Sequence, residues 1–244
     1  TQSYCCFLKS VTLLSENFGI TTGSNQVPAG WVTSNAAGTS TTNKWVGNNT
    51  GAGTYGFSGN TLHISNGNST AVTNGTAAMA YSSTATGTDA RAVTPLLNAA
   101  GLKDISVSLK LVSNGEIDSG TFYDFGLVYY TLNGTNYSVL TVLNNDVYLQ
   151  GITSSTTLNI NLPAGTIGTS NLRLMFRWIS DNSVANQPPF AIDDVVVTGK
   201  NVTVESQLNH AATENILSTS GSSNFYSSND GQVIAKLSNP SVSP

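Results

Sequence analysis

Alternating apolar and polar positions predict several β-strands. In 105–111, Ile, Val and Leu alternate with Ser and Lys, which is the period of a strand with one buried face. The alternation recurs in 158–162 and 172–178, and Asn133-Gly134 between two apolar stretches favours a hairpin. No stretch has the period of a long amphipathic helix, so the strands should pair largely antiparallel. We therefore predict an all-β fold, an antiparallel β-sandwich of the jelly-roll type.

The pattern also suggests where the domain begins and ends. Strand and turn signals run from 11 to 199, and residues 21–90, rich in Gly, Thr, Asn and Ser, are typical of long loops with short strands. After Gly199 the pattern restarts, and 225–237 favours a further hairpin. We expect a jelly-roll domain over 11–199, followed by a linker and the start of a second small β-unit over 200–244.

The composition narrows the functional class. Charged residues are only 9% of the chain, against roughly 25% in typical soluble domains, and hydrophobic residues are 39%. A polar but uncharged surface suits a secreted or cell-surface protein. The net charge is −4 and the nine basic residues are scattered, so we expect no nucleic-acid partner. No apolar run predicts a membrane span. The adjacent Cys5 and Cys6 are poorly placed for a relaxed mutual disulfide, so the fold should rest on its core.

Two adjacent carboxylates, Asp193 and Asp194, interrupt the apolar strand pattern of 190–197. Neighbouring residues of a strand face opposite sides, so one carboxylate should lie among apolar side chains, where an unpaired charge is costly. One candidate partner is calcium, which collects six to eight oxygen ligands. The alternatives are an ion pair with Arg173 or Arg177, and simple exposure at a sheet edge.

Several segments together resemble the cleaved-adhesin domains of gingipain-type surface proteins, which are similar in turn to the MAM domain. The resemblance covers about residues 13–198 and rests on SENFG at 15–19, VPAGW at 27–31, NKW at 43–45, AVTPLLN at 92–98, ISVSLKL at 105–111, FGLVYYTLNGTNYSVL at 125–140, LNINLPAG at 158–165, LRLMFRW at 172–178 and FAIDDVVV at 190–197.

This resemblance implies a non-catalytic jelly-roll module of a large secreted protein, with structural calcium. Many such proteins leave the cell by type IX secretion, and some serve gliding motility. In similar jelly rolls the calcium lies between the first and last strands, which implies a metal site made by Glu16 with Asp193 or Asp194. The partners implied are a surface glycan or protein ligand and the type IX machinery.

Aromatic side chains are candidates for contact with a sugar. Trp31 and Trp178 lie in motif or strand contexts that favour core packing. Trp45, flanked by Lys44 and a loop of Gly and Asn, is the better candidate for a surface ligand site.

Catalytic signatures are weak. Glu116 and Asp118 are two residues apart, as on one strand face, which would suit a glycosidase pair or a second cation site; a solvated loop is the simpler interpretation. His63 alternates with Leu62 and Ile64, so we expect it to point outward, and His210 follows a polar segment. Neither a G-x-S-x-G elbow nor an HExxH motif occurs, so we predict that the chain is not an enzyme.

The sequence thus predicts a non-catalytic extracellular adhesion or binding module of a larger protein, stabilised by calcium. The alternative is a carbohydrate-binding module appended to a secreted hydrolase.

Overall fold

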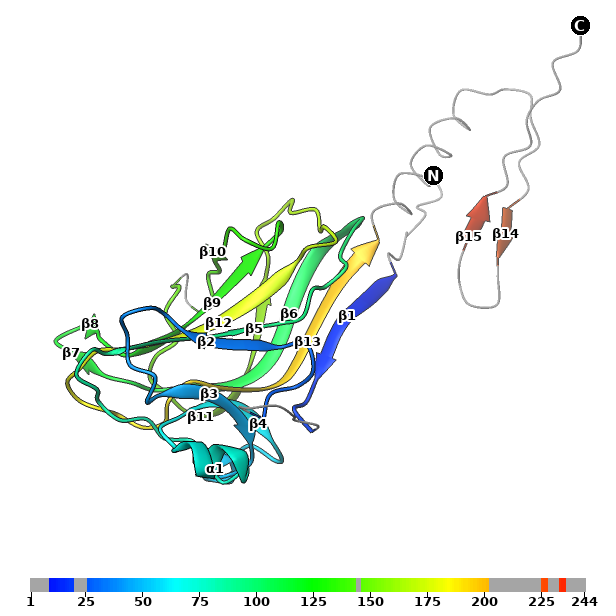
Figure 1. Cartoon of the computed structure of the whole chain (residues 1–244). Coiled ribbons are helices and arrows are strands. Elements are labelled where there is room, and N and C mark those ends of the chain that lie inside the picture. Colours follow the sequence, from blue (N-terminus) through cyan, green and yellow to red (C-terminus); the bar gives the residue numbers. More distant parts are fainter. Residues whose placement is uncertain (1–8, 20–25, 144–145, 202–224, 228–232, 236–244) are drawn as a thin grey trace, which may run out of the picture.

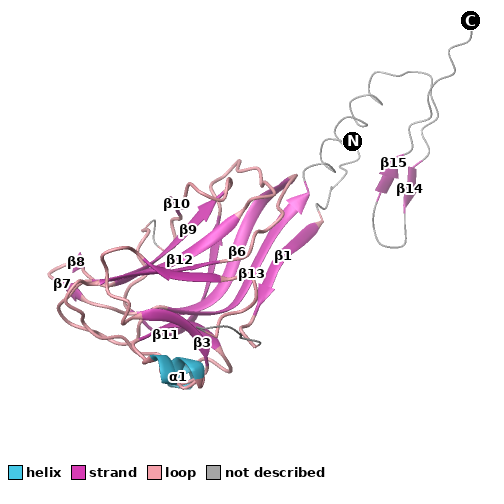
Figure 2. Ribbon diagram, in the orientation of Figure 1, coloured by secondary structure: helices cyan, strands magenta, loops and turns pink. Residues whose placement is uncertain are grey.

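The computed structural model describes residues 9–19, 26–143, 146–201, 225–227 and 233–235. Two antiparallel sheets pack face to face (Figures 1 and 2), so the prediction of an all-β sandwich of the jelly-roll type is confirmed. The six-stranded sheet has the order β11-β6-β13-β4-β3, with β1 also paired to β13. Its strands are β1 (Ser10–Glu16), β3 (Lys44–Asn48), β4 (Thr61–Ser65), β6 (Leu102–Ser113), β11 (Ile152–Asn161) and β13 (Ala191–Asn201).

The five-stranded sheet has the order β10-β9-β12-β5-β2. Its strands are β2 (Val32–Asn35), β5 (Thr88–Val93), β9 (Phe125–Thr131), β10 (Ser138–Val139) and β12 (Arg173–Ser180). A short hairpin of β7 (Ile117–Asp118) and β8 (Thr121–Phe122) projects at one end of the sandwich (Figure 1), which we call the loop end. The 3-10 helix η1 (Ala52–Tyr55) and the single-turn helix α1 (Ser69–Thr73) complete the sandwich domain.

The core lies between the two sheets, where the alternation placed it. Ile105, Val107 and Leu109 of β6 point inward, and so do Phe176 and Trp178 of β12. Each fully buried side chain of this size contributes roughly 1.5–3 kcal/mol to folding. The predicted core positions of Trp31 and Trp178 are confirmed.

Trp45 lies in the same core, so the expectation that it is at the surface is wrong. Its side chain is 1% exposed, and its ring packs edge-on against Phe190 at 5.4 Å between centroids. A buried ring has no face to offer a ligand. The sequence misled because the polar residues on both sides of Trp45 suggested a loop, whereas β3 is an edge strand with its apolar side turned inward.

His63 is also buried, against expectation. The chain around α1 covers the outer face of β3 and β4, where Val46, Val72 and Ala77 pack together. His63 Nδ1 lies 2.9 Å from Thr61 Oγ1, and Nε2 lies 3.2 Å from the carbonyl oxygen of Ala77. Burial lowers the pKa of His63 to about 4, so the imidazole is neutral at physiological pH.

A β-bulge in β13 changes which side chains face the core. Phe190 and Ile192 point inward before it, and Val195 and Val197 after it. The register against β6 shifts between Asp193 and Val196, and Asp194 has a positive φ of 49°. The strict alternation predicted across 190–197 is therefore wrong, because the bulge inserts one extra residue at the Asp pair.

The predicted hairpins can be compared with the described strands. β9 and β10 pair around Asn133-Gly134, and Gly134 has the positive φ that the turn requires. β14 (Phe225–Ser227) pairs with β15 (Val233–Ala235), which confirms a hairpin in this segment. Within the described part of the chain, neither helix is long and apolar enough to cross a membrane.

Candidate functional site

Three carboxylates meet at the loop end and form what we call the acidic cluster: Glu116, Asp124 and Asp181. Glu116 precedes β7, Asp124 lies between β8 and β9, and Asp181 follows β12. One ligand oxygen from each lies within 4.8 Å of the others. Two oxygens that ligate one calcium at 2.3–2.6 Å are at most roughly 5 Å apart, so the three carboxylates could bind a single metal ion.

Asp124 is the buried centre of the acidic cluster, with 0% of its surface exposed. Tyr81 Oη donates a hydrogen bond of 2.5 Å to Oδ2, and the Asp181 backbone N–H donates one of 2.9 Å to Oδ1. Burial raises the pKa of Asp124 to about 6, the charges of Asp181 and Glu116 add to this, and the two hydrogen bonds oppose it. A bound cation would offset the cost of the buried charge.

The close approach of the chain at residue 115 to the backbone of Asp124 requires glycine. A Cβ built there would lie 2.3 Å from the Asp124 carbonyl oxygen, and the residue has φ of +78°. Beside it, Glu116 Oε2 accepts hydrogen bonds from Ser183 Oγ at 2.6 Å and from the Val184 backbone N–H at 3.1 Å. The loops of β7 and of 181–187 are thereby joined at the cluster.

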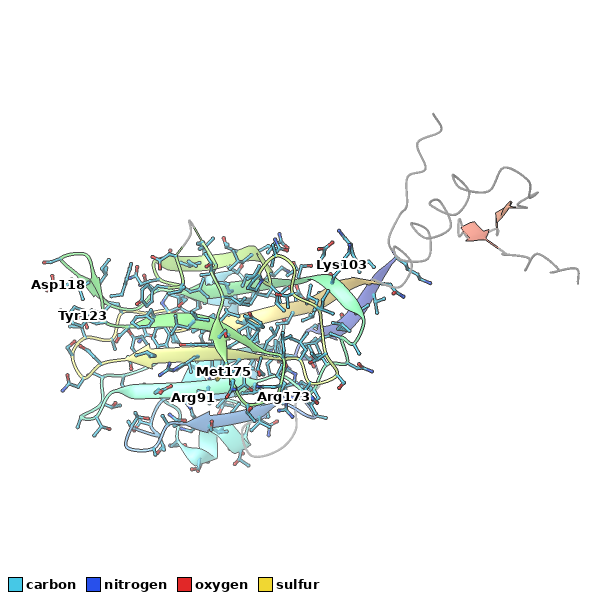
Figure 3. All side chains as sticks on the ribbon, turned by 90° about the horizontal axis from the view of Figure 1, so that it is seen from above. Arg91, Lys103, Asp118, Tyr123, Arg173 and Met175 are labelled. Carbon is cyan, nitrogen blue, oxygen red and sulfur yellow. The ribbon has the colours of Figure 1, made fainter. Side chains whose placement is uncertain are left out.

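Sequence reasoning found only part of the acidic cluster. Glu116 was a candidate ligand of a second cation site, but paired with Asp118. Asp118 lies in the exposed β7–β8 hairpin at the tip of the loop end (Figure 3) and hydrogen-bonds to neighbouring Ser119. The true neighbours, Asp124 and Asp181, come from other connections, and no spacing in the sequence relates them to Glu116.

The predicted calcium ligands lie where β1 runs beside β13. Glu16 stands opposite Val195 in the register, and its Oε1 accepts a 2.7 Å hydrogen bond from the Phe18 backbone N–H. Asp193 is buried, and burial raises its pKa to about 6, with the negative charges of Asp194 and Glu16 adding to the shift. Asp193 is thus a buried carboxyl near a second carboxylate, and metal binding by this pair stays a prediction.

Asp194 is exposed and has a protein partner. Lys110 Nζ on neighbouring β6 lies 2.7 Å from its Oδ2, and this contact raises the pKa of Lys110. The alternative ion pair with Arg177 is wrong, because Arg177 lies in the other sheet and binds Asp89.

Asp89 holds two arginines on the outward face of the five-stranded sheet. Arg177 binds it through Nε and Nη2, both at 2.8 Å, and Arg91 through Nη2 at 2.8 Å and Nε at 3.2 Å. Burial alone would raise the pKa of Asp89, but the hydrogen bonds from both arginines outweigh it and hold the pKa below its ordinary value. Arg177 Nη1 also donates to Tyr129 Oη at 3.1 Å.

This outward face, which we call the arginine face, was not recognised in the sequence. In Figure 3, Arg91, Arg173 and Met175 lie on this sheet, whereas Tyr123 lies at the loop end. The available signal was the parity of 172–178: the alternation that turns Phe176 and Trp178 inward turns both arginines outward.

Comparisons with known proteins give structural likenesses only. Neither a scan of protein-family models nor a search of curated proteins matches the chain. The K1 cleaved adhesin domain of Lys-gingipain from Porphyromonas gingivalis W83 is a similar structure, with 16% identity and a TM-score of 0.43. The match covers 78% of this chain and 97% of that one. The CBM22-1 xylan-binding domain of Paenibacillus barcinonensis Xyn10C has 13% identity and a TM-score of 0.43, covering 80% and 99%.

An enzyme is equally similar: a Stig cyclase from Fischerella sp. TAU has 14% identity and a TM-score of 0.44, covering 79% and 99%. Because binding domains and a cyclase match equally well, these likenesses do not distinguish a binding module from an enzyme. The chain is an antiparallel β-sandwich whose function has to be inferred from its own residues.

Proposed function

We propose that the chain is a non-catalytic, extracellular glycan-binding module of a larger protein, with the arginine face as its binding surface. The observation that carries this proposal is the openness of that face at both edges. Val32 on β2 is 54% exposed and Val139 on β10 is 40% exposed, while Tyr129 and Arg91 between them are partly exposed. Exposed apolar groups next to fixed polar groups mark binding surfaces.

The arrangement of Tyr129 and Arg177 favours a sugar ligand. The Arg177 guanidinium carbon lies 6.0 Å from the centre of the Tyr129 ring, and its Nη1 binds the hydroxyl of the same residue. An aromatic ring provides apolar area with little conformational freedom to lose, and a fixed guanidinium provides directed donors for hydroxyl oxygens. The outer face of β3 and β4 in the other sheet, by contrast, is covered by the chain around α1.

Burial of the titratable groups supports a non-catalytic role. Asp124 has the raised pKa of a general acid, but it is fully buried and its two oxygens accept hydrogen bonds from Tyr81 and Asp181. His63 is buried and neutral. A general acid or base must come within hydrogen-bond reach of its substrate, and neither group is accessible.

Calcium belongs to the proposal as a structural ion. The acidic cluster offers three carboxylates in a compact group, and Glu16 with Asp193 and Asp194 is the second candidate. Both sets consist of oxygen donors, which calcium prefers. At the loop end the ion would hold the β7 and 181–187 loops together; near β1 it would hold the first strand to β13.

The uncharged polar composition supports an extracellular location. Type IX secretion and gliding motility rest on the sequence resemblance alone. A module of a surface adhesin and a module appended to a secreted hydrolase would use the same face, and the domains encoded beside this chain distinguish them.

A glycan array followed by calorimetry tests the proposal. We expect specific glycan binding that Tyr129→Ala weakens at least about tenfold, because the ring contributes stacking area. Tyr123→Ala, at the loop end, is the matched control and should bind like the wild type. Silence across neutral and acidic glycans would contradict the proposed function, and so would binding that only the control variant loses.

A further inference from the structure

All three arginines of the chain lie on the arginine face. In β5, Ala90 and Ala92 point into the core, so Arg91 points outward; in β12, Leu174, Phe176 and Trp178 point inward, so Arg173 and Arg177 point outward. Arg177 and Arg91 are direct partners in the register of the two strands. The face therefore concentrates a residue type that the rest of the sequence does not use.

The charge of this face differs from that of the protein. Within the strands of the five-stranded sheet, the charged residues are three arginines and one aspartate, which leaves a net charge of +2. The strands of the six-stranded sheet carry four lysines and four carboxylates, which cancel. The whole chain has a net charge of −4. The arginine face is thus a positive surface on an acidic protein, which points to an anionic ligand.

Asp89 holds the guanidinium groups of Arg91 and Arg177 in place and leaves some of their donors free. These two arginines each give two of their five N–H donors to the carboxylate, and Arg177 gives one more to Tyr129. The side chain of Arg91 is 37% exposed, so its remaining donors are accessible to a ligand. Holding the arginines in place beforehand lowers the entropy lost on binding.

An apolar row runs beside the arginines across all five strands. Its members are consecutive partners in the strand register: Val139, Tyr129, Met175, Val93 and Val32. Strands are spaced by about 4.8 Å, so the row spans roughly 19 Å. The neighbouring row contains Leu127, Arg177, Arg91 and Ser34. Met175, at the centre of the row, is only 8% exposed, so an extended ligand lying across the strands would meet the other four apolar side chains along one side and guanidinium groups along the other.

We infer that the arginine face binds a polysaccharide of uronic acids, with sugar carboxylates on Arg91 and Arg173 and the sugar rings along the row from Val139 to Val32. This inference rests on the proposed function and specifies its ligand. The carboxylate is favoured over a sulfate ester because the guanidinium groups of this face already hold a carboxylate, Asp89, in bidentate geometry.

Binding of polygalacturonate, neutral xylan, dextran sulfate and poly-glutamate to the whole chain tests the inference. We expect polygalacturonate to bind and the double variant Arg91→Gln, Arg173→Gln to lose at least about tenfold in affinity. Higher salt should weaken binding several-fold in the wild type and less in the variant. Lys200→Gln, on β13 of the other sheet, is the matched control and should bind like the wild type. Arg91→Lys keeps the charge but not the planar fork, and should lose only part of the affinity.

The outcomes separate this inference from the proposed function. If neutral xylan binds as tightly as polygalacturonate and Tyr129→Ala loses this binding, the proposed glycan-binding function stands but the inference of a uronic-acid ligand is overturned. Tighter binding of dextran sulfate would overturn the choice of carboxylate. Equal binding of poly-glutamate would show that charge alone attracts an acidic polymer and would also overturn it. If none of the glycans binds to the folded protein, as judged by its melting curve, the proposed function falls as well.

Discussion

Two individual carboxyl groups stabilise the folded state more at lower pH, which is the reverse of the usual effect of carboxylates on stability. Asp124 and Asp193 are buried, and each has a folded-state pKa of about 6, above the ordinary value of 3.8. A carboxyl whose pKa is raised by folding favours the folded state when protonated, and that contribution is lost as the pH rises through the folded pKa. His63 has the opposite effect, because its pKa falls on folding and its contribution is lost as the pH decreases below about 6.5.

A comparison with Asp124→Asn isolates the effect of Asp124. We expect the stability of the wild type, measured in EDTA, to improve relative to the variant as the pH falls from 7 to 5. His63 and Asp193 are present in both proteins, so their contributions cancel in the difference. Thermal melts at several pH values check this. Parallel pH curves for the two proteins would show that Asp124 does not titrate in this range.

At the scale of secondary-structure elements, two glycines at the β7–β8 hairpin differ in the space around them. Gly115 and Gly120 both have positive φ, 78° and 83°. A Cβ at Gly115 would lie 2.3 Å from the Asp124 carbonyl oxygen, whereas a Cβ at Gly120 has nothing within 4 Å. The chain therefore has room for a side chain at Gly120 but not at Gly115.

Alanine at these two positions separates backbone strain from displacement of the acidic cluster. Gly120→Ala should cost about 1–2 kcal/mol, the penalty for an L-residue in the left-handed region. Gly115→Ala should cost about 1–3 kcal/mol more, because the chain must move away from Asp124. Urea denaturation measures both. Equal costs would mean that the loop relaxes freely around Gly115.

At the scale of the whole molecule, structural calcium would hold separate parts of the chain together. The acidic cluster joins three connections at the loop end, and the Glu16 set joins β1 to β13. Either site is present only in the folded state, so a bound ion stabilises the fold by mass action, about 2.7 kcal/mol at one hundred times its Kd.

Melting curves with calcium and with EDTA test this. We expect calcium to raise the Tm and EDTA to reverse the change. Loss of the response in Glu116→Gln places the ion in the acidic cluster, and loss in Glu16→Gln or Asp194→Ala places it beside β13. Asp118→Asn, in the exposed hairpin next to the cluster, is the control. A wild-type Tm that ignores calcium would contradict both sites.

The sequence by itself determined the strands and the class of fold, because alternation is a local property and a strand needs one apolar face. It identified the inward sides of 105–111 and 172–178, and it singled out Asp193-Asp194 as two carboxylates in an apolar strand, although it predicted strict alternation through them. Only the tertiary structure showed that the strand has a bulge at this pair. The bulge keeps Val195 and Val197 in the core, buries Asp193 and leaves Asp194 to Lys110.

The candidate sites depended almost wholly on tertiary structure. Trp45 and His63 are buried because segments distant in sequence cover them. Arg177 and Asp89 are 88 residues apart in the chain and meet only because β12 pairs with β5, and Glu116, Asp124 and Asp181 converge from three connections. Periodicity reports which side of a strand faces the core, but not which strands become neighbours, so it cannot predict pairs of this kind.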